Sequence, residues 1–335
     1  MTHGIRIGIA GLGFMGQTHL TAYNAASLAG FPNTLVAVCD QDPDRRRGQI
    51  AEGGNIKTGA GTEQLFNPDV VAGYESPAEL FADPSVDLVS ICTPTDSHVE
   101  LALAAIAAGK HVLLEKPAAL NAEAIQPLLA AADAAKTLVM PAHCIRFWPA
   151  YAFLKACIDD KRYGNVQSAV FTRLASPPAW NADFYKNSAR SGGALVDLHI
   201  HDTDFIRHCF GDPTAVRSTG NLHHITTLFD FPNGPGHVVA EGGWDHAPGF
   251  PFRMAFTVIF DDATVDYDLS RETPLLVCAN GTAEPCDVGP LSGYDEEVRH
   301  ILHCIASGAA TTCVTISDAL GTAQLLDAER ASLQL

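Results

Sequence analysis

The sequence lacks an excess of basic residues and any long hydrophobic run. Its 21 Lys and Arg residues are outnumbered by 38 Asp and Glu residues, which gives a formal net charge of −17 at pH 7. A surface of this charge repels nucleic-acid phosphates and anionic lipid head groups. Because no stretch approaches ~20 uninterrupted apolar residues, no transmembrane helix is expected. We therefore expect no nucleic-acid partner and no membrane partner.

Paired cysteines are also lacking. The nine cysteines are scattered along the chain, and none shows the C-x-x-C spacing. Their odd number and wide distribution argue against a disulfide framework. The N-terminal segment does not combine a basic stretch with the apolar stretch of a secretory signal. These absences together predict a cytoplasmic protein.

A length of 335 residues is typical of two domains. The first half alternates short strands, apolar on both faces, with alanine-rich helices, a pattern typical of a parallel sheet covered by helices. Residues 53–73 are glycine-rich and are predicted to form a surface loop. The expected strands are Ile5–Ala10, Thr34–Cys39, Val86–Cys92, His111–Leu114 and Leu138–Ala142, and the expected helices are Gly13–Ala26, one after Asp42-Pro43, Val99–Ala108 and Ala122–Ala135.

The second half has a different pattern, in which strands follow one another with turns between them. Consecutive strands without intervening helices indicate a largely antiparallel sheet. We therefore predict a Rossmann domain over residues 1–146, followed by an α+β domain with a large, open, mostly antiparallel sheet over residues 147–335. The expected strands are Val166–Leu174, Ile225–Phe231, His237–Gly242, Phe252–Phe260, Thr264–Leu269 and Leu275–Ala279, and the expected helices are Leu195–Phe210, Tyr294–Ala306 and Ser317–Ser332.

A dinucleotide-binding motif follows the first strand. The segment Gly11-Leu-Gly13-Phe14-Met15-Gly16 has the G-x-G-x-x-G pattern between a predicted strand and a predicted helix. Gly11 permits a tight turn, Gly13 lets the backbone approach a pyrophosphate, and Gly16 lets the helix pack close to the strand. The helix N-terminus then offers free N–H groups and the positive end of its dipole to the phosphates. The alternative is an ordinary strand–turn–helix without a ligand.

Asp40 ends the second predicted strand, where a carboxylate can accept hydrogen bonds from the adenosine ribose hydroxyls. A carboxylate in this position repels a 2′-phosphate, so NAD is favoured over NADP as the cofactor. The alternative is that the nearby Arg45, Arg46 and Arg47 reach such a phosphate, but we interpret them as a solvated helix face.

Two further segments stand at strand ends, where ligands bind in open α/β sheets. These are Cys92-Thr-Pro-Thr-Asp-Ser-His98 and Glu115-Lys116-Pro117. Together with Arg146-Phe-Trp-Pro-Ala-Tyr151 and with the Gly192-Gly193 segment that runs to Asp204, they make the chain resemble the glucose–fructose oxidoreductase / inositol dehydrogenase / MocA (Gfo/Idh/MocA) family. The resemblance covers nearly the whole length. It implies the predicted fold, an NAD(P) cofactor and a homodimer or homotetramer.

The resemblance also implies roles for individual residues. Lys116 would hold the reacting oxygen beside the nicotinamide ribose, Asp197 would orient substrate or histidine, and His201 would act as general acid/base. The cofactor would be bound by residues of the glycine motif and of the strand ends. That set comprises Gly11, Gly13, Phe14, Met15, Gly16, Asp40, Thr93, Pro94, His98, Glu115 and Lys116.

The residue types fit alcohol oxidation independently of the family. A histidine titrates near neutral pH and so serves as a base without much tuning, and a lysine stabilises a developing alkoxide. Asp197 and His201 are four residues apart, so both project from one face of the expected helix, and Asp204 and His208 continue that stripe. The alternative is a polar surface stripe. His199 stands where many family members have glycine, which leaves the shape of the substrate pocket in question.

Several other residues were considered. His199 and His201 lack a compact set of further ligands, so no metal site is expected. Trp180 and Trp244 fit stacking on a sugar or packing in a core equally well. Arg146 fits a substrate contact or a pair with a carboxylate at the domain junction.

The predicted function is hydride transfer between NAD(P) and a secondary alcohol or ketone of a sugar, inositol or related polyol. One alternative is a glycoside-cleaving or lyase enzyme that oxidises its substrate transiently with tightly held NAD. Another is a non-enzymatic dinucleotide sensor. The presence of Lys116, Asp197 and His201 together argues against the sensor.

Overall fold

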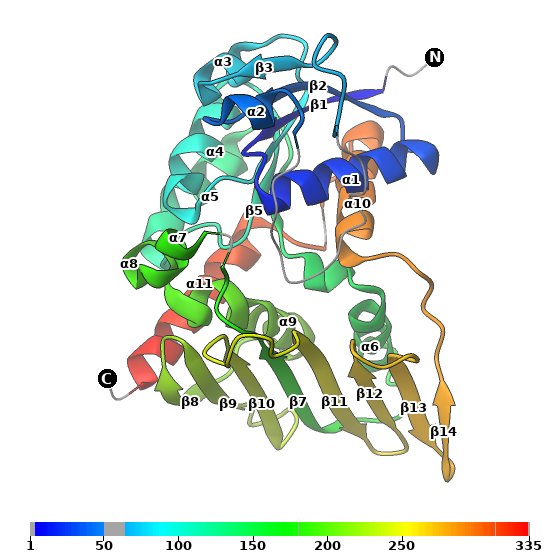
Figure 1. Ribbon diagram of the computed structural model, residues 1–335. Helices are drawn as coiled ribbons and strands as arrows, with labels where there is room; N and C mark the ends of the chain where they lie inside the picture. Colours follow the sequence, from blue (N-terminus) through cyan, green and yellow to red (C-terminus); the bar gives the residue numbers. More distant parts are fainter. Residues whose placement is uncertain (1–3, 50–63, 180, 312, 334–335) are drawn as a thin grey trace. The chain divides into compact units, whose positions relative to one another are not determined.

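The computed structural model describes residues 4–49, 64–179, 181–311 and 313–333 (Figure 1). The chain divides into two compact units: unit 1 comprises Met1–Cys144 and Gly293–Leu320, and unit 2 comprises Ile145–Ser292 and Gly321–Leu335. The predicted boundary after residue 146 lies close to the first of these divisions. The predicted second domain, however, included the segment Gly293–Leu320, which the structure assigns to unit 1.

Unit 1 contains a six-stranded sheet in the order β3-β2-β1-β4-β5-β6, and every neighbouring pair is parallel. The strand order reverses between β1 and β4, which is where open α/β sheets bind ligands at their carboxyl ends. The predicted parallel sheet is therefore confirmed. Its strands are β1 Ile5–Ala10, β2 Asn33–Cys39, β3 Ala72–Tyr74, β4 Leu88–Ile91, β5 His111–Glu115 and β6 Val139–Ala142.

Two helices of unit 1 begin at residues whose side chains cap them. The side chain of Asp42 accepts a hydrogen bond from the backbone N–H of Asp44 at the start of α2, and that of Asn121 accepts one from Ala124 at the start of α5. Helix α10 packs against α1 (Figure 1), which explains why this late segment belongs to unit 1. The helical segments are α1 Phe14–Leu28, α2 Pro43–Arg46, α3 Pro77–Ala82, η1 Thr95–Ser97, α4 His98–Ala107, α5 Ala122–Ala134 and α10 Gly293–Ser307.

Unit 2 contains an eight-stranded sheet in the order β14-β13-β12-β11-β7-β10-β9-β8. All of its neighbouring pairs are antiparallel except the inner pair of β7 and β10. The predicted, mostly antiparallel sheet is thus confirmed. Its strands are β7 Val166–Leu174, β8 Ala215–Asn221, β9 His224–Asp230, β10 His237–Gly243, β11 Arg253–Phe260, β12 Thr264–Asp268, β13 Leu275–Ala279 and β14 Thr282–Pro285.

The core of unit 2 lies between this sheet and the helices on one of its faces (Figure 1). Along β11, Met254, Phe256 and Val258 are buried, while Arg253 and Thr257 are exposed, as expected of a sheet with one covered face. The helical segments are η2 Cys144–Phe147 at the division between the units, α6 Pro149–Asp159, α7 Ala182–Lys186, α8 Ser188–Ser191, η3 Leu195–His199, α9 Ile200–Phe210 and α11 Ile316–Ser332, which enters unit 2 at Gly321.

The predicted surface loop over residues 53–73 is described only in part. Residues 53–63 lie outside the described part of the chain, and the loop prediction there stays open. From Gln64 the chain runs mostly without helix or strand, but the last two residues of the predicted loop begin strand β3.

Candidate active site

The turn between β1 and α1 needs glycine at two positions for steric reasons. Gly11 has a φ of +88°, and a Cβ there would lie 2.7 Å from the carbonyl oxygen of Cys92. A Cβ at Gly16 would overlap the carbonyl oxygen of Gly11. Among the described residues, by contrast, no atom lies within 4 Å of a Cβ built at Gly13. Packing therefore does not require glycine at position 13, and the absence of a side chain there leaves open space at the tip of the turn.

The N-terminus of α1 begins at this open space. Gly13 is the N-cap residue and has no side chain to cap the first turn. Phe14 and Met15 follow it and are half-buried. A 15-residue helix with its first N–H groups directed to an uncrowded turn is suited to binding a pyrophosphate.

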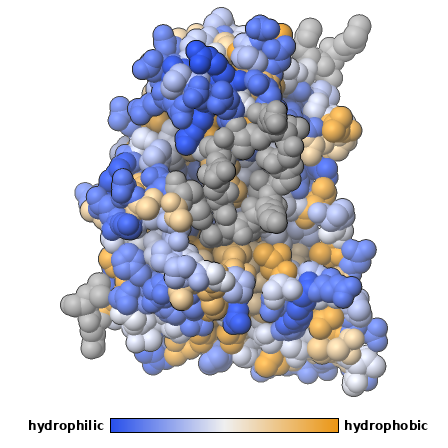
Figure 2. All heavy atoms as spheres, in the orientation of Figure 1, coloured by the Kyte–Doolittle hydropathy of each residue, from blue (hydrophilic) through white to orange (hydrophobic). Residues whose placement is uncertain are grey.

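Asp40 follows β2 and holds the same turn in place. One carboxylate oxygen accepts a hydrogen bond from the backbone N–H of Leu12 at 2.7 Å, and the other accepts one from Asp42 at 2.9 Å. Arg46 donates to the carbonyl oxygen of Asp40 at 2.7 Å, and the guanidinium of Arg45 lies 3.8 Å from its carboxylate. Hydrophilic residues gather over α2 (Figure 2), which agrees with a solvated face for these arginines.

His98 begins α4 and joins two strand ends rather than lining an open surface. Its side chain is buried, and its Nδ1 and Nε2 atoms each lie 2.8 Å from a carbonyl oxygen, those of Pro117 and Thr93 respectively. Burial lowers the pKa of His98, so the neutral ring donates a proton to one of the two carbonyls. His98 therefore positions Thr93 and Pro117, and its place in the cofactor pocket stays a prediction. Thr93 is half-buried and Pro94 is exposed.

Glu115 ends β5 and is buried. One carboxylate oxygen lies 2.9 Å from Nε2 of His19, and the other accepts a hydrogen bond from the backbone N–H of Lys116 at 3.0 Å. Although burial acts to raise it, the pKa of Glu115 is lowered by the hydrogen bond and charge of His19 and by the charge of Lys116. Glu115 therefore holds the backbone of Lys116, and the predicted cofactor contact of Glu115 stays a prediction.

Lys116 is the partly exposed residue in an otherwise buried segment. Every other residue from Val112 to Ala119 is buried. The Lys116–Pro117 peptide bond is cis. The strand, the buried Glu115 and the buried residues that follow fix the backbone of Lys116, while its side chain retains access to solvent at the carboxyl end of β5.

Asp197 and His201 in unit 2 are likewise partly exposed residues within a buried segment. From Ser191 to Ile206, every residue is buried except these two. The expected helix over Leu195–Phe210 is present, but its first turn, η3, is a π-helix that includes Asp197, and the α-helical part begins at Ile200. Single π turns within helices are frequent at functional sites. Two titratable side chains are thus the accessible groups of this helical segment up to Ile206.

Two glycines before η3 allow this helix to lie close to the β8–β9 turn. Gly192 and Gly193 have φ values of +75° and +73°. A Cβ at Gly193 would overlap the carbonyl oxygen of Leu222, and one at Gly192 would overlap the side chain of Val196. The Gly-Gly pair therefore has a steric role in placing Asp197.

His199 points into the interior of unit 2. It is fully buried, and its Nε2 atom lies 2.8 Å from a carboxylate oxygen of Glu329 in α11. Thr203 and Thr227 each donate a hydroxyl to the same carboxylate, at 2.8 and 2.7 Å. A Cβ at Gly242 would lie 2.6 Å from Nδ1 of His199, so glycine on β10 makes room for the ring. The imidazole that replaces the glycine of many relatives is therefore a packing residue and does not line an open pocket.

The sequence indicated that Asp204 continues the stripe of Asp197 and His201, but in the structure it does not. It is buried and accepts two hydrogen bonds from Arg146, each of 2.8 Å, and a third from the hydroxyl of Thr322. Its neighbour Asp202 accepts two hydrogen bonds from the buried Arg173 of β7, at 3.0 and 2.8 Å. The open question about Arg146 is thereby answered in favour of a carboxylate pair, within unit 2.

Trp244 is a packing residue as well. It is buried in a cluster with Ala175, Ala194 and Leu198, and its indole N–H donates to Nδ1 of His223 at 3.0 Å. These contacts favour the packing alternative over stacking on a sugar. Trp180 lies outside the described residues.

One group of polar residues escaped the sequence analysis. His224 at the start of β9 lies beside Asp245 and His246, which follow β10. The sequence does show two polar pairs, His223-His224 and Asp245-His246, next to predicted strands. The sequence did not indicate that these two strands pair with each other, so it gave no reason to place the two polar pairs in one group.

The structure thus gathers the predicted residues into two sets, each described within its own unit. In unit 1, the β1–α1 turn, Asp40, Thr93 and Lys116 all lie at carboxyl ends of neighbouring parallel strands. In unit 2, Asp197 and His201 are carried by η3 and α9. Within the described residues, no helix has both the length and the apolar composition needed to cross a bilayer.

Comparison with protein families gives two matches along the chain. A family model described as "Oxidoreductase family, NAD-binding Rossmann fold" matches residues 5–143. A second, described as "GFO/IDH/MocA C-terminal domain", matches residues 151–265. Together the two models of this family cover well over half of the sequence.

Curated relatives include inositol 2-dehydrogenase of Rhizobium meliloti, which is 32% identical over 217 residues, or 64% of this chain and 58% of that protein. Levoglucosan dehydrogenase of Pseudarthrobacter phenanthrenivorans is 30% identical over 225 residues, or 64% of this chain and 53% of that protein. The chain therefore aligns with little more than half the length of these relatives.

Solved structures resemble the chain over nearly its whole length. A levoglucosan dehydrogenase in complex with NADH and levoglucosan has a TM-score of 0.80 at 21% identity, covering 98% of this chain and 97% of that chain. UDP-N-acetylglucosamine 3-dehydrogenase from Acidithiobacillus ferrooxidans has a TM-score of 0.77 at 22% identity, covering 100% and 99%. At these identities the likeness establishes the fold.

Proposed function

Because the chain belongs to the Gfo/Idh/MocA oxidoreductase family, we propose that it is an NAD-dependent dehydrogenase acting on a secondary alcohol of a sugar, inositol or related polyol. The reverse reaction reduces the corresponding ketone. Relatives named as inositol and levoglucosan dehydrogenases support the polyol class. They leave the individual substrate open, because fold and family set the chemistry of the site more closely than its specificity.

The residues of unit 1 fit a dinucleotide. The open space at Gly13, the uncapped N-terminus of α1 and the Asp40 carboxylate at the end of β2 supply a pyrophosphate site and a ribose acceptor in their usual order. Asp40 also favours NAD over NADP, because its charge repels a 2′-phosphate. When bound, NAD supplies the acceptor for the hydride that leaves the substrate carbon.

The chain's own residues supply the proton chemistry. His201 accepts the proton of the reacting hydroxyl, because a histidine titrates near neutral pH and can return that proton in the reverse direction. Lys116 donates a hydrogen bond to the same oxygen and stabilises its developing negative charge. Asp197 orients the substrate or the imidazole. His98 and Glu115 hold the strand ends from which Thr93 and Lys116 project.

A single observation carries this proposal. Asp197 and His201 are the partly exposed residues in a segment that is otherwise buried from residue 191 to residue 206. A helix that merely presented a polar face to water would expose Asp202 or Asp204 as well, and both are buried in ion pairs. Selective access for one histidine and one carboxylate is what an active site requires.

The first test is absorbance at 340 nm with NAD, and then with NADP, across a panel of inositols, aldoses and sugar acids. Reduction of NAD with one class of polyol is the expected result. If no compound is oxidised but NAD remains bound through purification, a glycoside-cleaving or lyase reaction with transient oxidation replaces the proposal. Binding of NAD without any turnover of sugars or glycosides would indicate a dinucleotide sensor.

Variants then test the assigned roles. His201→Asn and Lys116→Ala are each expected to lower kcat by roughly 10²- to 10⁴-fold, the usual contribution of a general base or of a group that stabilises an oxyanion. The dissociation constant for NAD is expected to stay within about twofold in His201→Asn, as when an interaction with the transition state alone is lost, and Lys116→Ala is expected still to bind NAD. His208→Asn, on the same helix, is the matched control. A near-normal rate for either active-site variant would remove that residue from the chemistry.

A further inference from the structure

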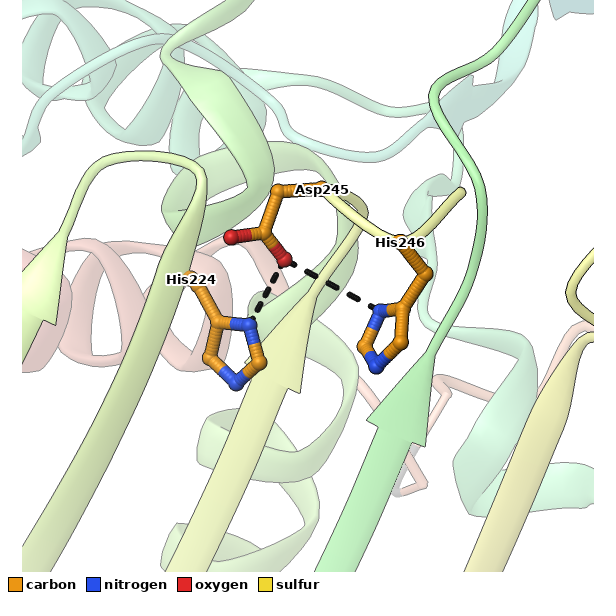
Figure 3. A group of neighbouring side chains, drawn as sticks. All are labelled: His224, Asp245 and His246. Carbon is orange, nitrogen blue, oxygen red and sulfur yellow. Dashed lines mark hydrogen bonds and ion pairs between the residues drawn. The ribbon is translucent and has the colours of Figure 1, made fainter. Parts of the chain in front are cut away.

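A group of polar side chains lies at the edge where β9 begins and β10 ends in unit 2. The two strands are antiparallel, and His224 pairs with Gly243. Two residues beyond Gly243, the chain places Asp245 beside His224, with His246 next to it (Figure 3). Gly243 makes room for the first ring, because a Cβ there would lie 2.8 Å from Cγ and Nδ1 of His224.

The nitrogen atoms of both rings are turned toward one carboxylate oxygen. Nδ1 of His224 lies 2.7 Å from Oδ1 of Asp245, and Nδ1 of His246 lies 3.8 Å from the same atom (Figure 3). One ligand atom from each of the three residues lies within 4.8 Å of the others. Ligands of a tetrahedral zinc ion, with bonds of about 2.0–2.2 Å, stand roughly 3.3 Å apart. Small side-chain movements therefore suffice to admit an ion between them.

His246 supplies a second, independent observation. Its Nδ1 atom is inaccessible to solvent and has no hydrogen-bond partner among the described residues. A buried polar atom without a partner is uncommon in native proteins and often marks the place of a missing ion or water. The ring is held by stacking on Phe250, with centroids 4.0 Å apart and an interplanar angle of 23°. The stacking thus fixes the direction of this nitrogen, although the nitrogen takes part in no hydrogen bond among the described residues.

Glu241 contacts the other ring nitrogen of His224. Its carboxylate oxygen lies 3.1 Å from Nε2 of His224, on the side of the ring opposite Asp245. Histidines that bind metals almost always donate their second N–H to a carboxylate or carbonyl, which fixes the tautomer and directs the other nitrogen to the ion. The neighbouring His223 is excluded from this role because its Nδ1 accepts the indole N–H of Trp244.

We propose that His224, Asp245 and His246 bind a divalent transition-metal ion, and that Glu241 orients His224 for that purpose. Two imidazoles and one carboxylate favour zinc and its neighbours over magnesium or calcium, which take oxygen ligands. A water molecule completes the coordination of the ion. The bound ion ties the segment after β10 to the start of β9, directly beyond Trp244 and its buried cluster.

The test is metal binding by the full chain after treatment with a chelator. Isothermal titration with Zn²⁺ at pH 7.5 is expected to show one site that His246→Gln weakens by at least tenfold. Glu241→Gln is expected to weaken it by roughly 10- to 100-fold, as for other residues that orient a ligand. His237→Gln, at the other end of β10, is the matched control and is expected to bind as the unaltered protein does.

Two further readouts separate this site from the cysteines of the chain. Co²⁺ is expected to give visible bands of tetrahedral coordination without a thiolate charge-transfer band, and these bands are expected to vanish in His246→Gln. Zn²⁺ is expected to raise the melting temperature of the unaltered protein but not of that variant. Equal binding by His246→Gln and His237→Gln, or no binding at micromolar zinc, would overturn the proposal. Should His246→Gln fail to fold, the same comparison is made with His224→Gln.

Discussion

Two buried carboxylates of unit 1 differ in what surrounds them. Glu115 has His19 and the backbone N–H of Lys116 as partners, and its pKa is lowered. Glu297, in α10, is fully buried, and neither carboxylate oxygen has a hydrogen-bond partner among the described residues. Burial, followed by the charge of Glu115, raises the pKa of Glu297 well above its ordinary value of 4.5. The folded protein therefore holds a proton that the unfolded chain loses.

This difference predicts how stability depends on pH. Because the pKa of Glu297 is raised by folding, its contribution makes the folded state less stable as pH rises above about 4.5, by about 1.4 kcal/mol for each pH unit until the raised value is reached. Glu297→Gln removes the ionisation and is expected to raise the free energy of unfolding at pH 8. The gain is expected to shrink toward pH 5.

Urea unfolding at pH 5 and pH 8 measures this effect. Glu296→Gln, a neighbour on α10 that is partly exposed and lies 3.6 Å from Arg299, is the control and is expected to show little change with pH. A Glu297→Gln protein that is equally stabilised at both pH values would show that Glu297 does not ionise in the unfolding reaction.

Cofactor preference is also decided at single residues. Asp40→Asn keeps an oxygen to accept the N–H of Leu12 or Asp42 but removes the negative charge. We expect NAD to bind more weakly and NADP more tightly, so that the ratio of their dissociation constants changes by about tenfold or more. Fluorescence titration with NADH and NADPH measures the ratio. Asp42→Asn is the control, and an unchanged preference in Asp40→Asn would contradict the ribose assignment.

At the scale of elements, helix α9 and the turn η3 are held by polar contacts that are themselves buried. Asp202 pairs with Arg173 of β7, Asp204 with Arg146, and Thr203 donates to Glu329 of α11. Buried ion pairs contribute little net stability but are costly to break, because one charge is left without compensation. They fix the rotation of the helix about its axis, and therefore which two side chains remain accessible.

Breaking one of these pairs is expected to be costly. Asp202→Asn leaves the guanidinium of Arg173 buried opposite a neutral amide, and a loss of about 3–5 kcal/mol in the free energy of unfolding is expected. Asp159→Asn removes the exposed partner of Lys155 and is expected to cost less than about 1 kcal/mol. Thermal and urea unfolding measure both. A small loss in Asp202→Asn would show that water reaches the pair.

The elements that the sequence predicted well are those with a strong hydrophobic pattern. The strand predicted over Ile5–Ala10 coincides with β1, and Val166–Leu174 with β7, because their residues pack on both faces or alternate regularly. Strands β8 and β14 were missed, since they lie at the two edges of the sheet and their residues are mostly exposed. Strand β3, also at an edge, has three residues, too few for any period.

The candidate site was predictable in part for a similar reason. Local spacing was enough to single out the glycine motif, and the family resemblance implied roles for Lys116, Asp197 and His201. Local spacing was not enough to show that Asp204 is buried, because its partner Arg146 lies 58 positions away in the sequence. Contacts between residues so far apart in the sequence depend on how the elements pack. The π turn at Asp197 likewise follows from packing.

At the scale of the whole molecule, the assignment of Gly293–Leu320 to unit 1 shows that chain order and spatial order differ. The chain leaves the first unit, builds most of the second, returns to unit 1 at Gly293 and enters unit 2 again at Gly321, so unit 2 is completed last. The predicted homodimer or homotetramer and the cytoplasmic location stay predictions. The negative charge of −17 remains the main global property and opposes binding to nucleic acids.

The parallel pairing of β7 and β10 within the larger sheet also dictates an order of assembly. Ser168 meets His237 only after the chain between them has folded back, and that connection contains η3, α9, β8 and β9. Parallel neighbours always require such a long crossover, and contacts between distant positions slow folding. Strand β10 thus joins β7 only after the segment that carries Asp197 and His201 has been made, and a nascent chain released before residue 237 would lack strands β10 to β14, five of the eight in the sheet.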